Sequence, residues 1–262
     1  MSKHSYPGLE LEKRGHIAIL TLANPPANTW TQDSLAALVE VVEALNADRE
    51  IYSLVVTGQG DKFFSAGADL KLFASGEKAI AAGMAHHFGR AFETLAAFRG
   101  VSIAAINGYA MGGGLECALA CDLRVAEEQA VLALPEAAVG LLPCAGGTQW
   151  LSWMVGEGWA KRLILCGERL DAATALRIRL VEEVTERGEA LKRALEIAQG
   201  VERQSPSSVA ACKRMIQAAR HMPPGQALAS ERAAFVKLFD TADQREGVTA
   251  FLEKRAPMWR NA

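Results

Sequence analysis

The chain has 262 residues, enough for one large domain with a substantial core or for two small ones. Half of the residues are hydrophobic and 22% are charged, a composition that is typical of globular proteins and excludes a disordered chain. The formal net charge of −2 gives no overall attraction to nucleic acid or to an anionic membrane, so neither is expected as a partner. A phosphate-bearing ligand must therefore be met by local basic residues.

The five cysteines point to a reducing compartment. They are odd in number and include no C-x-x-C pair, and no histidine or cysteine stands near them at zinc-ligand spacing. Cys117 and Cys121 share a helix face, where buried thiols are expected rather than metal ligands. Residues 1–6 lack the apolar core of a signal peptide, and no apolar run approaches the length of a membrane span. We therefore expect a cytoplasmic protein that is not embedded in a membrane.

The first part of the chain predicts strands alternating with a helix. Residues 9–13 and 16–22 have strand character, and residues 51–57 form a third strand-like run. Between them, residues 31–47 place their leucines and valines on one stripe of a helix. A strand, a helix and a strand in succession favour parallel pairing, so the predicted fold class is α/β.

Small residues dominate the next turn, at residues 63–71, where open α/β sheets usually contact their ligands. A long helix is expected over residues 77–98 and a strand over 101–106. After a glycine-rich turn and a short helix, residues 122–126 form another strand. Most of what remains is helical, at residues 148–155, 159–166, 172–178, 189–201, 206–219, 226–239 and 245–254. A helical section from Pro206 onward is of a kind that often packs on another subunit.

The most informative stretch is residues 106–116, which read INGYAMGGGLE. Three glycines lie where an apolar strand turns into an alanine-rich helix, so free backbone N–H groups face outward there. Such a site suits an anion, or an oxygen that becomes one during a reaction. Glu116 follows in the first helical turn, beside this candidate oxyanion site.

A second acid, Glu136, follows Pro135 at another predicted helix start. Two carboxylates in one apolar cleft can hold different protonation states, so one can give a proton while the other takes one. The pattern alone leaves a second explanation open, because acids are common in first helical turns and stabilise them. No histidine has a catalytic spacing, and the common serine-hydrolase and nucleotide-binding motifs are absent.

Beyond these patterns, the sequence resembles the crotonase superfamily, the enoyl-CoA hydratases and isomerases, over almost its full length. Five blocks carry the resemblance in the family's order. They are FSAGADLK at 64–71, INGYAMGGGLE at 106–116, PE at 135–136 with Gly140, GGTQ at 146–149, and a tail with EG at 246–247, Phe251 and EKR at 253–255.

The resemblance implies a spiral of repeated ββα units over residues 1–205, which holds an acyl-CoA thioester. It implies that residues 206–262 form a helical region that builds homotrimers, often paired into homohexamers. It also implies that no metal or redox cofactor is needed, with coenzyme A present only as part of the substrate. Residues 73–98 are expected to line the acyl pocket.

Site residues follow from the same resemblance. The backbone N–H groups of Ala68 and Gly113 match the family's oxyanion hole. Glu116 matches the residue that activates water, and Glu136 the one that supplies a proton to the α-carbon. The other positions that match substrate or CoA contacts are Ala66, Asp69, Leu70, Lys71, Phe251 and Lys254. For Lys71 and Lys254 an ordinary solvated lysine is an equally good explanation.

Three departures from the family pattern leave the acyl chain open. Residues 132–134 read LAL where the family commonly has Phe-Gly or Phe-Ala, Cys144 replaces glycine or aspartate, and Trp150 replaces arginine. The leading hypothesis is an enoyl-CoA hydratase, which adds water reversibly and syn to a trans-2-enoyl-CoA in acyl-CoA degradation. The alternatives are an isomerase that shifts the double bond and a noncatalytic acyl-CoA-binding homologue.

Overall fold

The fold is built on two sheets, which the computed structural model describes over residues 2–262. The larger sheet has seven strands in the order β1-β2-β3-β4-β6-β8-β11. The smaller has four, in the order β10-β9-β7-β5. The strands of the larger sheet are β1 (Ser2–Tyr6), β2 (Leu9–Arg14), β3 (Ile17–Leu22), β4 (Ser53–Gly58), β6 (Val101–Ile106), β8 (Leu123–Glu127) and β11 (Glu183–Thr185).

From β4 to β9, successive strands alternate between the two sheets. The smaller sheet contains β5 (Phe63–Ser65), β7 (Tyr109–Met111), β9 (Val131–Ala133) and β10 (Leu170–Asp171). Thus β4, β6 and β8 join the larger sheet, and the strand that follows each of them joins the smaller one. Within the larger sheet all pairings from β3 to β11 are parallel. In the smaller sheet β5 with β7 and β7 with β9 are parallel, and β9 with β10 is antiparallel. The repeated ββα spiral is therefore confirmed, with the parallel pairing expected around the first helix.

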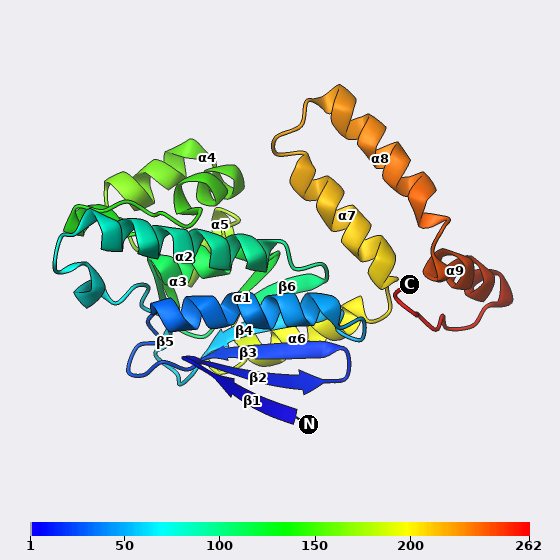
Figure 1. Cartoon of the computed structure of the whole chain (residues 1–262), viewed down its shortest axis with the longest axis horizontal. Coiled ribbons are helices and arrows are strands. Elements are labelled where there is room, and N and C mark those ends of the chain that lie inside the picture. Colours follow the sequence, from blue (N-terminus) through cyan, green and yellow to red (C-terminus); the bar gives the residue numbers. More distant parts are fainter. Residues whose placement is uncertain (1) are drawn as a thin grey trace.

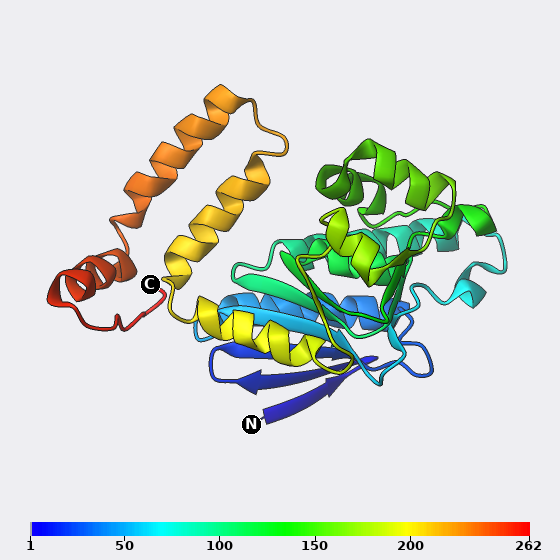
Figure 2. The same cartoon turned by 180° about the vertical axis from the view of Figure 1, so that it is seen from behind.

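Helices cover both faces of the larger sheet (Figures 1 and 2). On one side α1 (Gln32–Ala47) and α2 (Lys78–Ala96) pack together, and α6 (Ala190–Val201) covers the other. Strand β4 is buried along its whole length, because Leu54 and Val56 face the first side and Val55 faces the second. Further helices are α3 (Gly113–Ala120), α4 (Gly147–Leu165), α5 (Ala172–Arg177) and the 3₁₀ turns η1 (Leu70–Phe73) and η2 (Glu136–Val139).

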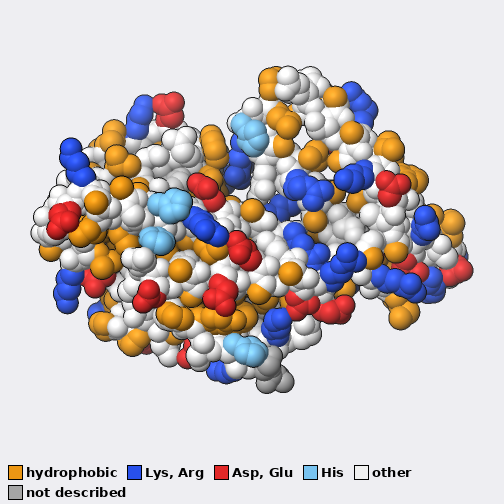
Figure 3. All heavy atoms as spheres, in the orientation of Figure 1, with side chains coloured by type: hydrophobic (Ala, Val, Ile, Leu, Met, Phe, Trp, Pro, Cys, Tyr) orange, Lys and Arg blue, Asp and Glu red, His pale blue; other side chains and the backbone are white. Residues whose placement is uncertain are grey.

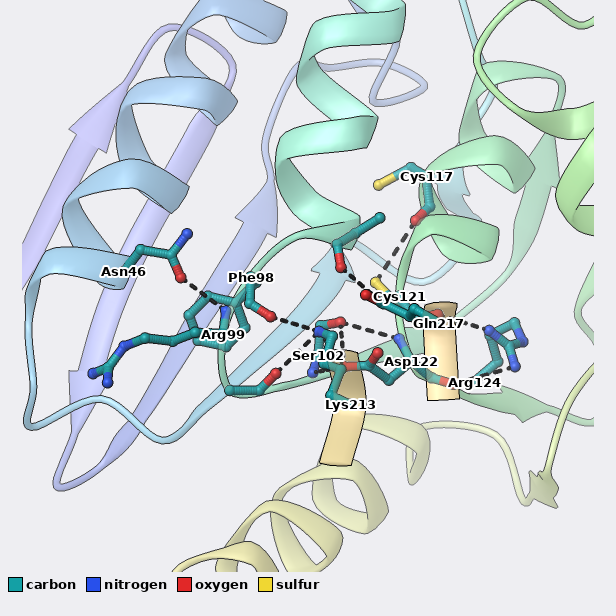
Figure 4. Close-up of polar contacts among 12 residues, drawn as sticks. Asn46, Phe98, Arg99, Ser102, Cys117, Cys121, Asp122, Arg124, Lys213 and Gln217 are labelled. Atoms are coloured by element: carbon teal, nitrogen blue, oxygen red, sulfur yellow. Dashed lines mark hydrogen bonds and ion pairs between the residues drawn. The ribbon is translucent and has the colours of Figure 1, made fainter. Parts of the chain in front are cut away.

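The C-terminal helices extend away from the two sheets as an arm (Figures 1 and 2). They are α7 (Pro206–Ala218), α8 (Pro224–Leu238) and α9 (Ala242–Glu253). Lys213 anchors the arm, since its Nζ donates to Phe98 O at 2.6 Å, Gly100 O at 3.1 Å and Asp122 Oδ2 at 2.7 Å (Figure 4).

The predicted elements differ from the observed ones chiefly in the short strands. The small-residue turn at 63–71 begins with β5, and the glycine-rich turn contains β7. Strands β1, β9, β10 and β11 were not predicted either, and all of these but β1 have two or three residues, too few for a periodic pattern. The helices expected at 148–155 and 159–166 are the two helical segments of α4, which meet at Gly156, where the backbone is not helical. As predicted, Cys117 and Cys121 are buried, and all five cysteines are free.

Two absences apply to residues 2–262. No helix there is long and apolar enough to cross a membrane. No group of three or more His, Cys, Asp or Glu side chains in that range is arranged to hold a metal ion.

Candidate active site

A cavity of about 350 Å³ lies where β5, α3 and the η2 segment meet. Six of the ten predicted site residues line it: Ala66, Ala68, Leu70, Gly113, Glu116 and Glu136. They come from segments up to 70 residues apart in sequence, so the spiral brings them together. Phe73 and Phe88 also line the cavity, which confirms that the 73–98 segment contributes to its wall.

The Ala68 N–H points into this cavity because its peptide plane is fixed from the other side. The carbonyl oxygen of Gly67 accepts a hydrogen bond from Trp30 N at 2.8 Å. In a trans peptide the C=O and the following N–H point in opposite directions. The Ala68 N–H is thus turned away from Trp30, and it donates to no acceptor among the described residues.

The Gly113 N–H, at the start of α3, is also oriented by a hydrogen bond to the carbonyl of its own peptide. Gly112 O accepts the first helical hydrogen bond, from Glu116 N at 2.9 Å. The Gly113 N–H of that peptide therefore points backward out of the helix, where it too has no acceptor within residues 2–262. The positive end of the helix dipole adds to its attraction for a developing negative charge.

These two N–H groups lie close together because glycine is present at the crossing. Gly67 has a φ of +87°, and a Cβ there would lie 2.6 Å from Met111 O and 3.1 Å from Gly113 N. Any side chain at position 67 would separate the two turns. The geometry suits one carbonyl oxygen held by two backbone donors, as an oxyanion hole requires.

Glu116 is buried, with 2% of its surface exposed. Its Oε1 accepts hydrogen bonds from Ala145 N at 2.8 Å and Gly147 N at 2.9 Å. Burial raises the pKa of this carboxyl, and the two N–H donors oppose the rise. With Oε1 occupied by backbone amides, Oε2 is the oxygen that remains for a ligand or water.

Glu136 lies close to the start of α3. Its Oε1 is 2.9 Å from the position that a Cβ on Gly112 would take, and its Oε2 is buried without a hydrogen-bond partner. Burial raises the pKa of Glu136 to about 7, and the negative charge of Glu116 adds to the effect. At neutral pH the carboxyl therefore carries a proton a substantial part of the time.

The remaining predicted CoA contacts lie outside the cavity lining. Asp69 caps η1, its Oδ1 accepting from Lys71 N at 3.0 Å, and both side chains are at the surface. Phe251, which is 84% exposed, and Lys254 lie at the end of α9. That helix is at the far end of the molecule from η1 (Figures 1 and 2), so one chain does not bring these two residues to its own cavity.

Sequence patterns missed other parts of the cavity wall, including Leu141, Leu142 and Arg169. Arg169 is the one cationic side chain among the described residues that line it. Cys144 was noted only as a departure from the family pattern. It lines the cavity, and partial desolvation together with the charges of Glu116 and Glu136 raises the pKa of its thiol to about 11.

A larger hollow, of about 560 Å³, lies between the sheet and α7. Its acid, Asp122, is already paired with Lys213 at 2.7 Å and bonded to Ser102 (Figure 4). No second carboxylate faces Asp122 in the part of this hollow that the structure describes. The smaller cavity is therefore the better candidate for proton-transfer chemistry.

Comparisons with known proteins agree with this geometry. The enoyl-CoA hydratase/isomerase family model matches residues 12–262. The chain is 38% identical over 250 residues to a short-chain-enoyl-CoA hydratase of Clostridium acetobutylicum, covering 94% of both chains. It is 39% identical to the 2,3-dehydroadipyl-CoA hydratase of Escherichia coli, covering 95% of this chain and 97% of that one. The structure of Pseudomonas aeruginosa DspI superimposes with a TM-score of 0.94 at 65% identity, covering 97% of each chain. The chain belongs to the enoyl-CoA hydratase/isomerase family, in the crotonase superfamily.

Proposed function

We propose that the protein is an enoyl-CoA hydratase that adds water reversibly and syn across the double bond of a trans-2-enoyl-CoA. The observation that carries the proposal is the cavity itself, where two acids in different environments face two free backbone N–H groups. A thioester oxygen held by Ala68 and Gly113 makes the acyl chain electron-poor at its β-carbon. The two acids then carry out the two proton transfers that the addition of water requires.

In this mechanism Glu116 acts as the base. Its free Oε2 takes a proton from water while the water oxygen bonds to the β-carbon. Electrons of the double bond move toward the thioester oxygen, and the enolate is held by the two N–H donors. Glu136, in its acid form, gives its proton to the α-carbon. One water is added in total, and the proton left on Glu116 restores Glu136 through exchange with water.

We propose that this chemistry proceeds with no metal or redox cofactor. The thioester activates the α- and β-carbons once its oxygen is held, and both proton transfers have a carboxyl in place. Coenzyme A enters only as part of the substrate.

We propose further that the chain works as a homotrimer, or as a homohexamer of paired trimers. Helix α8 has no buried residue; Phe235 and Val236 on it, and Phe239 at its C-terminal cap, are each more than half exposed. An apolar helix surface of this kind favours burial against a second copy. Residues 206–262 would then form the assembly region.

The same assembly accounts for the predicted CoA contacts that lie far from the cavity. Lys and Arg side chains gather over the C-terminal helices on the face that Figure 3 shows. We propose that Lys254 and Phe251 of one subunit approach the CoA bound to its neighbour, and that Lys71 meets the CoA phosphates beside its own cavity. The free thiols suit a reducing compartment, and we propose a cytoplasmic location and a role in acyl-CoA degradation.

A turnover panel tests the proposal. Wild type, Glu116→Gln and Glu136→Gln are each given trans-2-enoyl-CoAs from short to long, with branched and aromatic members, and also 3-enoyl-CoAs. We expect wild type to form 3-hydroxyacyl-CoA, and each variant to lose about 10²–10⁴-fold in kcat while keeping its fold. A double-bond shift without hydroxyacyl product would identify an isomerase. Thermal stabilisation by acetoacetyl-CoA with no turnover would identify an acyl-CoA-binding homologue.

A further inference from the structure

In the turn that carries Ala68, the neighbouring backbone N–H groups at positions 66, 67 and 69 all donate hydrogen bonds. Ala66 N donates to Ala27 O at 2.9 Å, and Asp69 N donates to Trp30 O at 3.4 Å. Gly67 N donates to the hydroxyl of Ser65 at 3.2 Å. Only the Ala68 N–H of this run has no acceptor within residues 2–262. The direction of that one donor therefore depends on how firmly its neighbours are tied.

Ser65 is the centre of this arrangement. Its side chain is entirely buried, and its hydroxyl donates to Asn28 O at 2.7 Å while accepting from Gly67 N. The same residue supports the other half of the oxyanion site, because a Cβ on Gly114 of α3 would lie 2.2 Å from Ser65 O. One residue thus touches the turn that presents Ala68 and the helix that presents Gly113.

Asn28 holds Ser65 in place from the opposite side. It is 4% exposed and has a φ of +52°, a backbone state that asparagine tolerates better than most residues. Its Nδ2 donates to Gln59 O at 3.0 Å and to Phe63 O at 2.9 Å, so it clamps both ends of the turn that leads into β5. The carbonyl that receives the Ser65 hydroxyl is therefore itself fixed.

We propose that Ser65 and Asn28 are positioning residues that aim the Ala68 N–H at the thioester oxygen of the substrate. Neither side chain is among those that line the cavity, so both act through the backbone of the turn. The inference rests on the proposed hydratase function and deepens it. Loss of the Ser65 hydroxyl leaves the Gly67 N–H and the Asn28 C=O buried and unpaired, which loosens the Ala66–Gly67 peptide next to the peptide that carries the Ala68 N–H.

The test compares Ser65→Ala with Ser102→Ala. Ser102 is an equally buried serine whose hydroxyl also donates one bond and accepts one, to and from Asp122 at 3.0 Å each (Figure 4). The two variants thus lose the same kind of side chain. Ser102 differs in that it lies beside the larger hollow and away from the cavity. Asn28→Gly is a third variant, because glycine keeps the left-handed backbone and removes only the side-chain donors. Ser65→Cys restores a weak donor and acceptor at the same position.

Three readouts are taken with the best substrate of the turnover panel: kcat and KM separately, the thermal midpoint, and the infrared stretch of the bound, isotope-labelled thioester carbonyl. We expect Ser65→Ala to lower kcat by about 10–100-fold with little change in KM, since small misplacements of a catalytic group cost this much. Its carbonyl stretch should shift less toward low frequency than in wild type. Asn28→Gly should show a smaller loss of the same kind, Ser65→Cys a partial recovery, and Ser102→Ala a stability loss alone.

Equal kcat in Ser65→Ala and Ser102→Ala, or an unchanged carbonyl stretch in Ser65→Ala, would overturn the positioning role. If Ser65→Ala does not fold, Asn28→Gly and Ser65→Cys decide, and wild-type kcat in both overturns it as well. Lack of wild-type turnover on the whole panel is a separate result. It removes the proposed function, and the inference that rests on it.

Discussion

The two glutamates differ in how their carboxylate oxygens are satisfied. Glu116 has two backbone N–H donors on Oε1, which favour its charged form. The Oε2 of Glu136 is buried without a partner, which favours the neutral form. One cavity thus holds two carboxyls in different environments, as the proposed roles of proton acceptor and proton donor require.

The pKa of Glu136 leads to a prediction for activity against pH. Its acid form is the proposed proton donor, so kcat for hydration should fall as the pH rises through about 7. At low pH the rate should fall again when Glu116 becomes protonated. A pH profile of kcat checks this, with the residual activity of Glu136→Gln as control, because that variant should lack the alkaline limb. An alkaline limb that survives in Glu136→Gln would assign it to another group.

The same group predicts how stability depends on pH. In the folded protein the pKa of Glu136 is about 7, above its ordinary value of 4.5, so the folded state holds the proton more tightly than the unfolded state. Its contribution favours folding at low pH and is lost as the pH rises from 4.5 to about 7. Glu136→Gln should therefore melt higher than wild type at pH 8, with a smaller gap at pH 5. A gap of constant size across this range would contradict the assignment.

For single residues, the sequence motifs predicted that the two acids and the two amide donors belong to one site, because those residues stand in recognisable blocks. Leu142, Cys144 and Arg169 were not predicted as cavity residues. They enter the wall only through the path of the chain after η2, which no local pattern encodes. Asn28 and Ser65 lie far apart in sequence, and only the tertiary structure shows that they are hydrogen-bonded.

Among the elements, the contact between α3 and β5 determines the shape of the site. Gly114 approaches Ser65 so closely that a Cβ would lie 2.2 Å from its carbonyl oxygen. Gly114→Ala should therefore push the helix from the strand and cost about 1–3 kcal/mol of unfolding free energy. It should also lower kcat, because the two N–H donors separate. Denaturant unfolding and turnover measure the two effects.

Gly83 of α2 is the matched control for that substitution. It is exposed, and a Cβ there would meet nothing within 4 Å. Gly83→Ala should stabilise the protein by about 0.5–1 kcal/mol, because alanine favours a helix interior. If both alanine variants shift stability in the same direction, the close approach of Gly114 does not limit packing.

Long elements were predictable and short ones were not. Helix α1 was expected over 31–47 and spans Gln32–Ala47, because its apolar stripe repeats over several turns. Strands β5, β7 and β9 have three residues each, and their pairing depends on neighbours in the spiral rather than on their own pattern. The kink in α4 comes from Gly156, whose backbone leaves the helical region (φ +77°, ψ +160°).

For the whole molecule, the exposed surface of α8 predicts assembly. Phe235 and Phe239 stack edge to face, 5.4 Å between ring centroids, and both are more than half exposed. Light scattering should give three or six times the mass of one chain. Phe235→Asp should yield smaller species, whereas Ala233→Asp, which adds the same charge on another side of the helix, should not. A wild-type monomer would contradict the proposed assembly.

The spiral arrangement is the feature least accessible from residue patterns. Hydrophobic periodicity indicated an α/β protein with parallel strands, but not that successive strands alternate between two sheets. That detail came with the resemblance to the crotonase superfamily, because the connecting segments carry no repeat of fixed length. The anchoring of the arm by Lys213 was likewise beyond prediction, since its acceptors are 91 to 115 residues away in sequence.

The source of the added oxygen tests the hydratase proposal most directly. Wild type is incubated with a substrate of the turnover panel in water enriched in the heavy oxygen isotope, and the acyl-CoA product is analysed by mass spectrometry. We predict a 3-hydroxyacyl-CoA that carries one heavy oxygen on the β-carbon, formed at a rate that falls by orders of magnitude in Glu116→Gln and Glu136→Gln. Product without heavy oxygen, or undiminished incorporation in either variant, would contradict the account.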